Sequence, residues 1–79
     1  MKYHVYILEC SDYTFYTGYT TDLNRRLLEH NSSKLGAKYT KGRRPVFLKY
    51  SKEFETLSKA LKFECYLKTL SREDKKKLF

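Results

Sequence analysis

Five side chains in this sequence carry groups suited to acid–base or charge-stabilising chemistry: Tyr6, Tyr16, Arg26, His30 and Glu64. Hydrolysis of a phosphodiester needs a base for the attacking water, a cation against the charge that develops at phosphorus, and usually a hard metal held by a carboxylate. A phenol is a poor base at neutral pH unless nearby cations lower its pKa. The chain holds 17 Lys and Arg, so the five residues together fit this reaction better than unrelated roles.

Each of these residues also has a structural alternative. Tyrosine is an ordinary strand residue. Arg26 can extend its guanidinium to solvent, and His30 can be a satisfied residue at a helix C-terminus, where the dipole favours it. Glu64 can pair with Lys68 at i+4. Mg²⁺ often uses only one or two protein carboxylates and keeps its waters, so Glu64 alone is enough to bind one divalent ion, Mg²⁺ or Mn²⁺.

The two tyrosines belong to a predicted β-hairpin. Residues 3–10 are rich in β-branched and aromatic types, and residues 14–19 form a second strand that returns antiparallel after a turn. Val5 and Ile7 face one way, whereas the other face is also largely apolar, so we expect helices on both faces. A three-residue turn places Tyr6 and Tyr16 on the same face, and an even-numbered turn separates them. Gly18 marks either a close backbone approach or a strand terminus.

Arg26 and His30 lie on a predicted helix that follows the hairpin. Thr20 and Thr21 are candidate N-caps, Asp22 adds an acid to the first turn, and the helix runs to about residue 30 or 31. At about 100° per residue, the inward side of this helix combines apolar and cationic or polar groups. Its members are Leu23, Arg26, Leu27 and His30.

The second half of the chain predicts one further strand and two helices. Residues 31–45 lack a sustained period and contain the only proline, which predicts a long basic loop, and residues 46–52 alternate as a strand. A long helix begins near residue 55, and a short one over 72–78 follows Ser71, an N-cap candidate with Asp74 three residues later. Glu64 interrupts the apolar stripe of the long helix, which consists of Leu57, Ala60, Leu61, Leu67 and Leu70.

Charge and length limit the class of protein. Seventy-nine residues form one domain, 1–79, and a net charge of +8 predicts a polyanionic partner. The excess lies in residues 23–52, where Glu29 is the single acid. No apolar run approaches the roughly 20 residues needed to cross a bilayer, and membrane-surface binding usually comes with a basic amphipathic helix. Cys10 and Cys65 are too few for a disulfide framework, so we expect a cytoplasmic protein with reduced thiols.

The same residues resemble a known family, the GIY-YIG nucleases, and in particular its short stand-alone bacterial members. The first motif stands here as His4-Val5-Tyr6 and the second as Tyr16-Thr17-Gly18. Residues 36–45 and the ending Leu70-Ser71-Arg72 are also similar to the stand-alone proteins, so the resemblance covers essentially the whole chain. His4 replaces the leading glycine of the first motif and Thr17 the middle residue of the second, and neither change removes a chemical group.

The resemblance implies an α/β sandwich with a small three-stranded antiparallel sheet flanked by about three helices. It also implies that Glu64 binds one divalent metal and that Arg26 stabilises the phosphorane-like transition state. Either Tyr6 or Tyr16 would activate or orient water, and His30 would be auxiliary. Gly18 would be structural at the site.

We therefore expect a metal-dependent endonuclease that acts as a monomer on DNA rather than RNA, at branched, flapped or otherwise structured sites in repair or recombination. A non-catalytic or partner-dependent nucleic-acid-binding module on the same fold is the alternative, and a protein-interaction domain is a third. A bare domain offers little for reading base edges, so sequence specificity should be low. The residues expected to hold phosphates are Arg25, Lys38, Lys41, Arg43 and Arg44.

Overall fold

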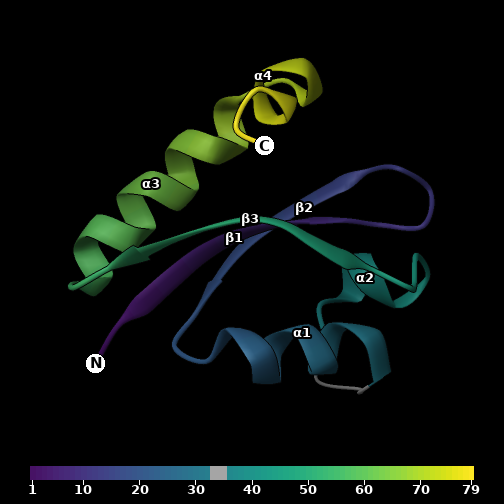
Figure 1. Cartoon of the computed structure of the whole chain (residues 1–79), viewed down its shortest axis with the longest axis horizontal. Helices are drawn as coiled ribbons and strands as arrows, with labels where there is room; N and C mark the ends of the chain where they lie inside the picture. The colour runs from purple at the N-terminus through teal and green to yellow at the C-terminus, as the bar shows by residue number, and fades with distance from the viewer. Residues whose placement is uncertain (33–35) are drawn as a thin grey trace.

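The computed structural model describes residues 1–32 and 36–79 of the chain. A three-stranded antiparallel sheet lies at its centre in the order β2-β1-β3. Helices α1 and α2 lie along one side of this sheet, and α3 with α4 along the other (Figure 1). The elements are β1 (Tyr3–Glu9), β2 (Phe15–Thr20), α1 (Leu23–Ser32), α2 (Lys38–Lys41), β3 (Phe47–Phe54), α3 (Leu57–Thr69) and α4 (Arg72–Lys76).

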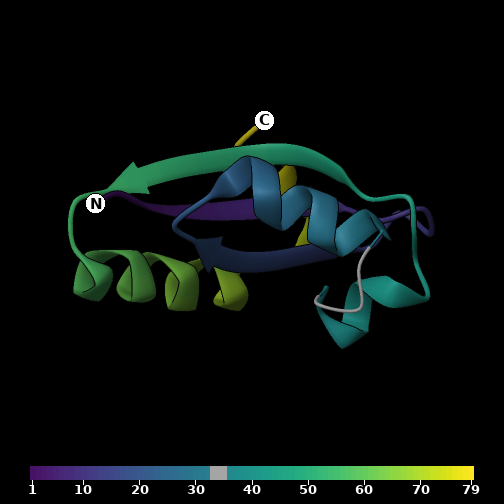
Figure 2. The ribbon, with the colours of Figure 1, turned by 90° about the horizontal axis from the view of Figure 1, so that it is seen from below.

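Both faces of β1 are buried. The sequence predicted this burial, because the residues on both faces of the strand are largely apolar. Val5 and Ile7 pack with Ala60 and Leu67 of α3. The opposite face, which includes Tyr6 and Leu8, packs against partly buried side chains of α1. Seen from below, α1 crosses in front of the strands (Figure 2). The predicted α/β sandwich is confirmed, because a central strand with two apolar faces must be covered from both sides.

The hairpin turn has three residues, so the odd-numbered alternative is confirmed. The Cys10 N–H donates to the Thr14 carbonyl at 2.8 Å, and Tyr13 between them has φ 67°. The register then sets Leu8 opposite Tyr16 and Tyr6 opposite Gly18. Side chains two apart on a strand share a face. Tyr6 and Tyr16 therefore project from the same face of the sheet.

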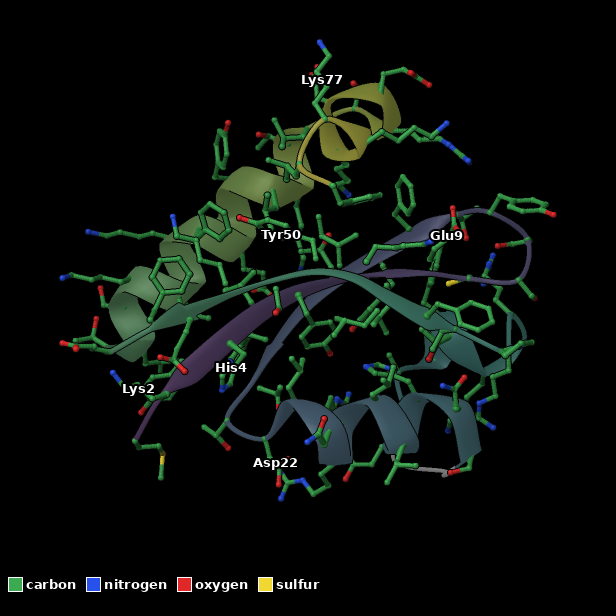
Figure 3. All side chains as sticks on the ribbon, viewed as in Figure 1. Lys2, His4, Glu9, Asp22, Tyr50 and Lys77 are labelled. Atoms are coloured by element: carbon green, nitrogen blue, oxygen red, sulfur yellow. The ribbon has the colours of Figure 1, made fainter. Side chains whose placement is uncertain are left out.

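Helix α1 is anchored at both ends by side chains. Asp22, at its start in Figure 3, accepts a hydrogen bond from the Arg25 N–H at 3.1 Å, so Asp22 rather than Thr20 or Thr21 is the N-cap. At the other end, the Asn31 amide exchanges two hydrogen bonds with the backbone of Val46, at 2.7 and 3.0 Å. The end of α1 is thereby tied to the beginning of β3.

The predicted loop over residues 31–45 is wrong in part. It contains the last two residues of α1 and the short helix α2, and its residues 33–35 lie outside the described part of the chain. Four residues are too few to show a helical period, so α2 gave no sequence signal. Its Thr40 is fully buried and donates to the Ala37 carbonyl at 2.9 Å.

Two predicted features of the C-terminal half also need correction. Thr56 caps α3 by accepting from the Lys59 N–H at 3.2 Å, so this helix begins later than predicted. Leu57 and Leu61 are each 40% exposed, because the line of α3 that meets the sheet runs through Ala60 and Leu67 instead. Ser71 does cap α4 as predicted, although this helix ends at Lys76, and β3 extends to Phe54 rather than to residue 52.

Two remaining expectations concern membranes and thiols. None of the described helices is both long enough and apolar enough to cross a bilayer. Cys10 is buried and Cys65 is exposed, and both are free thiols.

Candidate active site

One open cavity of about 460 Å³ collects four of the five chemical residues from four different elements. Tyr6 comes from β1, Tyr16 from β2, Arg26 from α1 and Glu64 from α3. The fifth, His30, does not line this cavity. The remaining lining residues are Gly18, Tyr19, Thr20, Thr21, Arg25 and Glu29.

Tyr6 is held against the sheet with its hydroxyl at the floor of the cavity. Only 2% of the residue is exposed, and its Oη lies 2.8 Å from His30 Nε2. A Cβ at Gly18 would lie 2.7 Å from that hydroxyl oxygen and 2.9 Å from the ring carbon bearing it. Real Cβ atoms do not approach that closely, so Gly18 is needed for a close approach and is not merely a strand terminus.

His30 stands behind Tyr6 and is completely buried. Its Nδ1 lies 3.0 Å from Thr40 Oγ1, whose own hydrogen is donated to the Ala37 carbonyl. With the proton on Nδ1, the ring donates to Thr40 and Nε2 accepts from the Tyr6 hydroxyl. With the proton on Nε2, Nδ1 instead accepts from the Ala37 N–H at 3.4 Å and Nε2 donates to Tyr6 Oη. His30 acts on the cavity through Tyr6.

Burial, followed by the charge of Arg26, lowers the pKa of His30 to about 4. The ring is neutral at pH 7, so the attraction of a cation to the helix C-terminus does not hold it there. Burial also raises the pKa of Tyr6 to about 12, although a hydrogen bond from Arg26 opposes the shift. The expectation that nearby cations lower a tyrosine pKa is wrong for Tyr6, because desolvation exceeds their effect.

Tyr16 has different surroundings on the same face. The residue is half-buried, and its ring stacks on Tyr39 with centroids 5.8 Å apart. The ring edge also meets His30, at 5.3 Å between centroids. Among residues 1–32 and 36–79, the Tyr16 hydroxyl has no hydrogen-bond partner, in contrast to that of Tyr6. Tyr16 therefore presents a hydroxyl that is not committed to another side chain.

Arg26 is oriented by a carboxylate that the sequence analysis did not select. Its Nη1 donates to Glu29 Oε1 at 2.8 Å, and Arg25 Nε lies 3.8 Å from Glu29 Oε2. Glu29 thus holds two arginines at one side of the cavity. The available signal was its position as the single acid within residues 23–52.

Glu64 is the other carboxylate of the cavity, and its side chain is only 15% exposed. Lys68 Nζ lies 3.8 Å away at i+4, so the structural pairing and the cavity position occur together. The described residues contain no group of three or more His, Cys, Asp or Glu able to hold a metal. One carboxylate beside an open polar cavity fits Mg²⁺ or Mn²⁺, which keep waters or substrate oxygens as their other ligands.

The predicted phosphate contacts divide into two groups. Arg25 lines the cavity, and Lys38 and Lys41 are exposed on α2. Arg43 Nε is 3.0 Å from Asp12 Oδ2, and its guanidinium lies 4.1 Å from the Tyr39 ring centroid. Arg44 donates to the His30 carbonyl at 2.6 Å and so satisfies the end of α1. Arg43 and Arg44 thus have structural partners, and phosphate binding by any of these residues stays a prediction.

Tyr39 and Thr40 are the residues that sequence reasoning missed, because their segment was interpreted as loop. Tyr39 supports Tyr16 by stacking, and Thr40 Oγ1 contacts His30 Nδ1 at 3.0 Å. The one available signal was that Tyr39 is the only aromatic residue within 31–45.

We predict that His30 makes folding pH-dependent between pH 7 and pH 4. Its pKa is about 4 when folded and about 6.5 when unfolded, so in this window the unfolded chain binds a proton that the folded chain does not. The free energy of unfolding should therefore fall by about 3 kcal/mol as the pH falls. Urea unfolding of the wild type and His30→Gln measures the effect. Equal pH slopes in the two proteins would contradict it.

We also predict that position 18 does not accept a residue larger than glycine. Gly18→Ala should displace Tyr6 and lower the free energy of unfolding by about 1–3 kcal/mol. The NMR signals of the Tyr6 and His30 rings should shift with it. Gly42→Ala is the matched control, because a Cβ there meets nothing within 4 Å, and its effect should stay below about 1 kcal/mol. If both variants are equally stable with unchanged ring signals, the close approach is not constraining.

Comparison with known proteins identifies this arrangement. Residues 2–77 match the GIY-YIG catalytic domain. A UPF0213 protein of Halobacterium salinarum is 53% identical over 77 residues, which is 98% of this chain and 99% of that protein. A UPF0213 protein of Staphylococcus saprophyticus is 51% identical over 98% of this chain and 93% of its own length.

Two solved structures share the fold. The solution structure of a UPF0213 protein from Bacillus halodurans is 47% identical, with a TM-score of 0.62 over 99% of this chain and 82% of that one. A solution structure from E. faecalis is 46% identical, with a TM-score of 0.68 over 98% and 81%. Since the family match spans nearly the whole chain and the relatives agree over the same length, this chain belongs to the GIY-YIG nuclease superfamily.

Proposed function

We propose that this chain is a metal-dependent endonuclease that hydrolyses phosphodiester bonds of DNA, at branched, flapped or otherwise structured sites in repair or recombination. The observation that carries the proposal is the cavity in which Tyr6, Tyr16, Arg26 and Glu64 meet. These side chains supply a base, a cation and a metal-binding carboxylate, the three groups that the reaction needs. The superfamily to which the chain belongs supports the same reaction class.

Binding and charge stabilisation would fall to the two arginines of α1. The Arg26 guanidinium is always charged, and Glu29 holds it in one orientation beside the cavity. It can therefore face the oxygens of a phosphorane-like transition state without reorganising during the reaction. Arg25, with a side chain 61% exposed at the cavity, is placed to hold a neighbouring phosphate.

The proton of the attacking water would pass to the Tyr16 phenolate, which forms when the Tyr16 hydroxyl releases its own proton to the solvent of the open cavity. The Tyr6 hydroxyl is engaged by neutral His30 and has a raised pKa, which makes it a poor base. Its remaining lone pair can accept a hydrogen bond from water and orient it. The Tyr16 hydroxyl is not engaged by another described side chain and faces the same cavity. We therefore assign proton transfer to Tyr16 and positioning to Tyr6.

Glu64 would hold the divalent ion, Mg²⁺ or Mn²⁺. Such an ion supplies Lewis-acid polarisation of a phosphoryl oxygen and stabilises the leaving oxygen. Glu64 is mostly buried and keeps only Lys68 as an ion-pair partner among the described residues. A carboxylate in that position can bind a hard cation without being taken from a strong internal ion pair.

We expect purified wild-type protein with Mg²⁺ or Mn²⁺ to nick labelled DNA, and Glu64→Gln to lower the rate more than about 100-fold, since metal assistance is worth several kcal/mol. Glu73→Gln, an exposed carboxylate on α4, is the matched control and should cut normally. Chelation of the metal with EDTA should stop cleavage by the wild type and by Glu73→Gln. Equal cleavage by wild type and Glu64→Gln would refute the proposal.

The two tyrosines should differ when each loses its hydroxyl. Tyr16→Phe should lower the single-turnover cleavage rate by about 10²–10⁴-fold, as expected for removal of a general base. Tyr6→Phe should lower the rate less, and it should raise the pKa of His30 if the phenol is the donor to the neutral imidazole. NMR titration of the His30 ring measures that shift. A larger rate loss in Tyr6→Phe would reverse the assignment.

A DNA-binding module that does not cut, or that needs a partner protein to cut, is the second candidate. The net charge of +8 and the exposed Lys38 and Lys41 favour nucleic-acid binding independently of catalysis. This candidate predicts salt-sensitive DNA affinity that survives Glu64→Gln while neither protein cuts.

A further inference from the structure

A second concave surface lies at the side of α3 that borders β3. It is a shallow hollow of about 370 Å³, lined by Phe54, Lys59, Lys62, Phe63 and Tyr66, which we name the α3–β3 groove. None of these residues lines the candidate active site. In Figure 3, Tyr50 of β3 points from the sheet toward α3 beside this region.

Aromatic rings form a continuous row along the groove. The centroids of Phe54 and Phe63 are 5.2 Å apart, and those of Phe63 and Tyr66 are 6.0 Å apart. Tyr50 extends the row inward, at 6.5 Å from Phe63. Tyr66 is 55% exposed, and both phenylalanines are half-buried. A contiguous exposed aromatic surface of this kind marks a binding site more often than scattered single rings do.

Positive charge accompanies the rings. Lys52 Nζ lies 5.7 Å from the Phe54 centroid and 5.2 Å from that of Phe63, and Lys59 and Lys62 line the groove. Within the described residues, none of these three lysines pairs with a carboxylate. The neighbouring acids Glu53 and Glu55 both lie within 3.8 Å of Lys2 instead. The groove therefore combines flat apolar faces with three uncompensated cations.

We propose that the α3–β3 groove binds a single-stranded DNA segment that flanks the bond to be cut, an inference that rests on the proposed function. Unpaired bases offer planar faces that stack on aromatic side chains, and their phosphates match a lysine-lined rim. Bases within a duplex are stacked on one another and cannot do this. An apolar protein partner would use the rings but would bury the lysines without compensation.

The position of the groove on α3 suits this role. Phe63 and Glu64 are adjacent in sequence, so the helix turns them about 100° apart and presents one to the groove and the other to the candidate active site. A helix with its side chains is about 10 Å wide, so a few nucleotides suffice to cross it. A strand that crosses α3 can therefore reach both surfaces, and the cut would fall a few nucleotides from the bound bases.

Binding is tested by fluorescence anisotropy in EDTA, with all proteins carrying Glu64→Gln so that no cleavage occurs. The probes are labelled oligo(dT) of about 12 nucleotides and a duplex of equal length. Tyr66→Ala should weaken single-strand binding by about 5- to 100-fold and duplex binding by less than about twofold, because paired bases cannot stack on this ring. Tyr13→Asn is the matched control, since it removes a tyrosine that is 67% exposed and asparagine tolerates the positive φ at this site.

The lysines are tested by the salt dependence of the same binding. The double variant Lys59→Gln/Lys62→Gln should reduce the slope of log affinity against log salt by about 1.4 for single strands. Lys76→Gln/Lys77→Gln removes the same charge from α4, where both lysines are paired with acids, and should leave the slope nearly unchanged. NMR should show upfield shifts of the Phe63 and Tyr66 ring protons on addition of oligo(dT).

Three results would overturn the inference: equal single-strand affinities of Tyr66→Ala and Tyr13→Asn, equal losses on single strands and duplex, or ring signals that do not move. The first result would instead favour a protein-binding surface. Because the assay involves neither metal nor cleavage, it fails or succeeds separately from the nuclease proposal. A chain that cuts DNA without using the groove, or uses the groove without cutting, would be recognised as such.

Discussion

The buried hydrogen bond between Tyr6 Oη and His30 Nε2 is the interaction on which the site depends. It joins the central strand to α1 at 2.8 Å between two buried side chains, where a polar group left unpaired would cost about 1–3 kcal/mol. Thr40 of α2 completes the network through its hydrogen bond with the other ring nitrogen, at 3.0 Å. Gly18 of β2 leaves room for this network, because any side chain at position 18 would displace the Tyr6 phenol. Residues from β1, α1, α2 and β2 thus together fix the position of the Tyr6 phenol.

This network explains why a histidine and two tyrosines can be close together and still differ in function. Burial keeps the His30 ring neutral, and a neutral ring can accept the proton that Tyr6 donates. The contact with His30 fixes the direction of the Tyr6 hydroxyl, and burial raises the pKa of that hydroxyl. Tyr16 is outside this chain of hydrogen bonds and is supported by stacking on Tyr39. One tyrosine is therefore rigid and the other chemically available.

Helix α3 has two different sides, and in the proposed function each would contact a different part of a nucleic-acid substrate. Glu64 faces the cavity of the candidate site, whereas Phe63 and Tyr66 form a row of rings with lysines beside it. In the proposed function, these two surfaces would select the substrate through charge and stacking rather than through base-edge contacts.

The sequence alone determined the sheet, the positions of the main helices and the chemical groups of the site. Local patterns suffice for these, because the β-branched and aromatic residues of 3–10 and the stripe of Leu23 and Leu27 depend on near neighbours. The tertiary structure decided what distant contacts control. It placed His30 behind Tyr6, Arg44 on the end of α1 and Glu29 between two arginines. It also turned part of a predicted loop into α2, since Thr40 is stabilised by a ring ten residues away. Desolvation, which no local pattern records, raised the pKa of the tyrosine that cations were expected to lower.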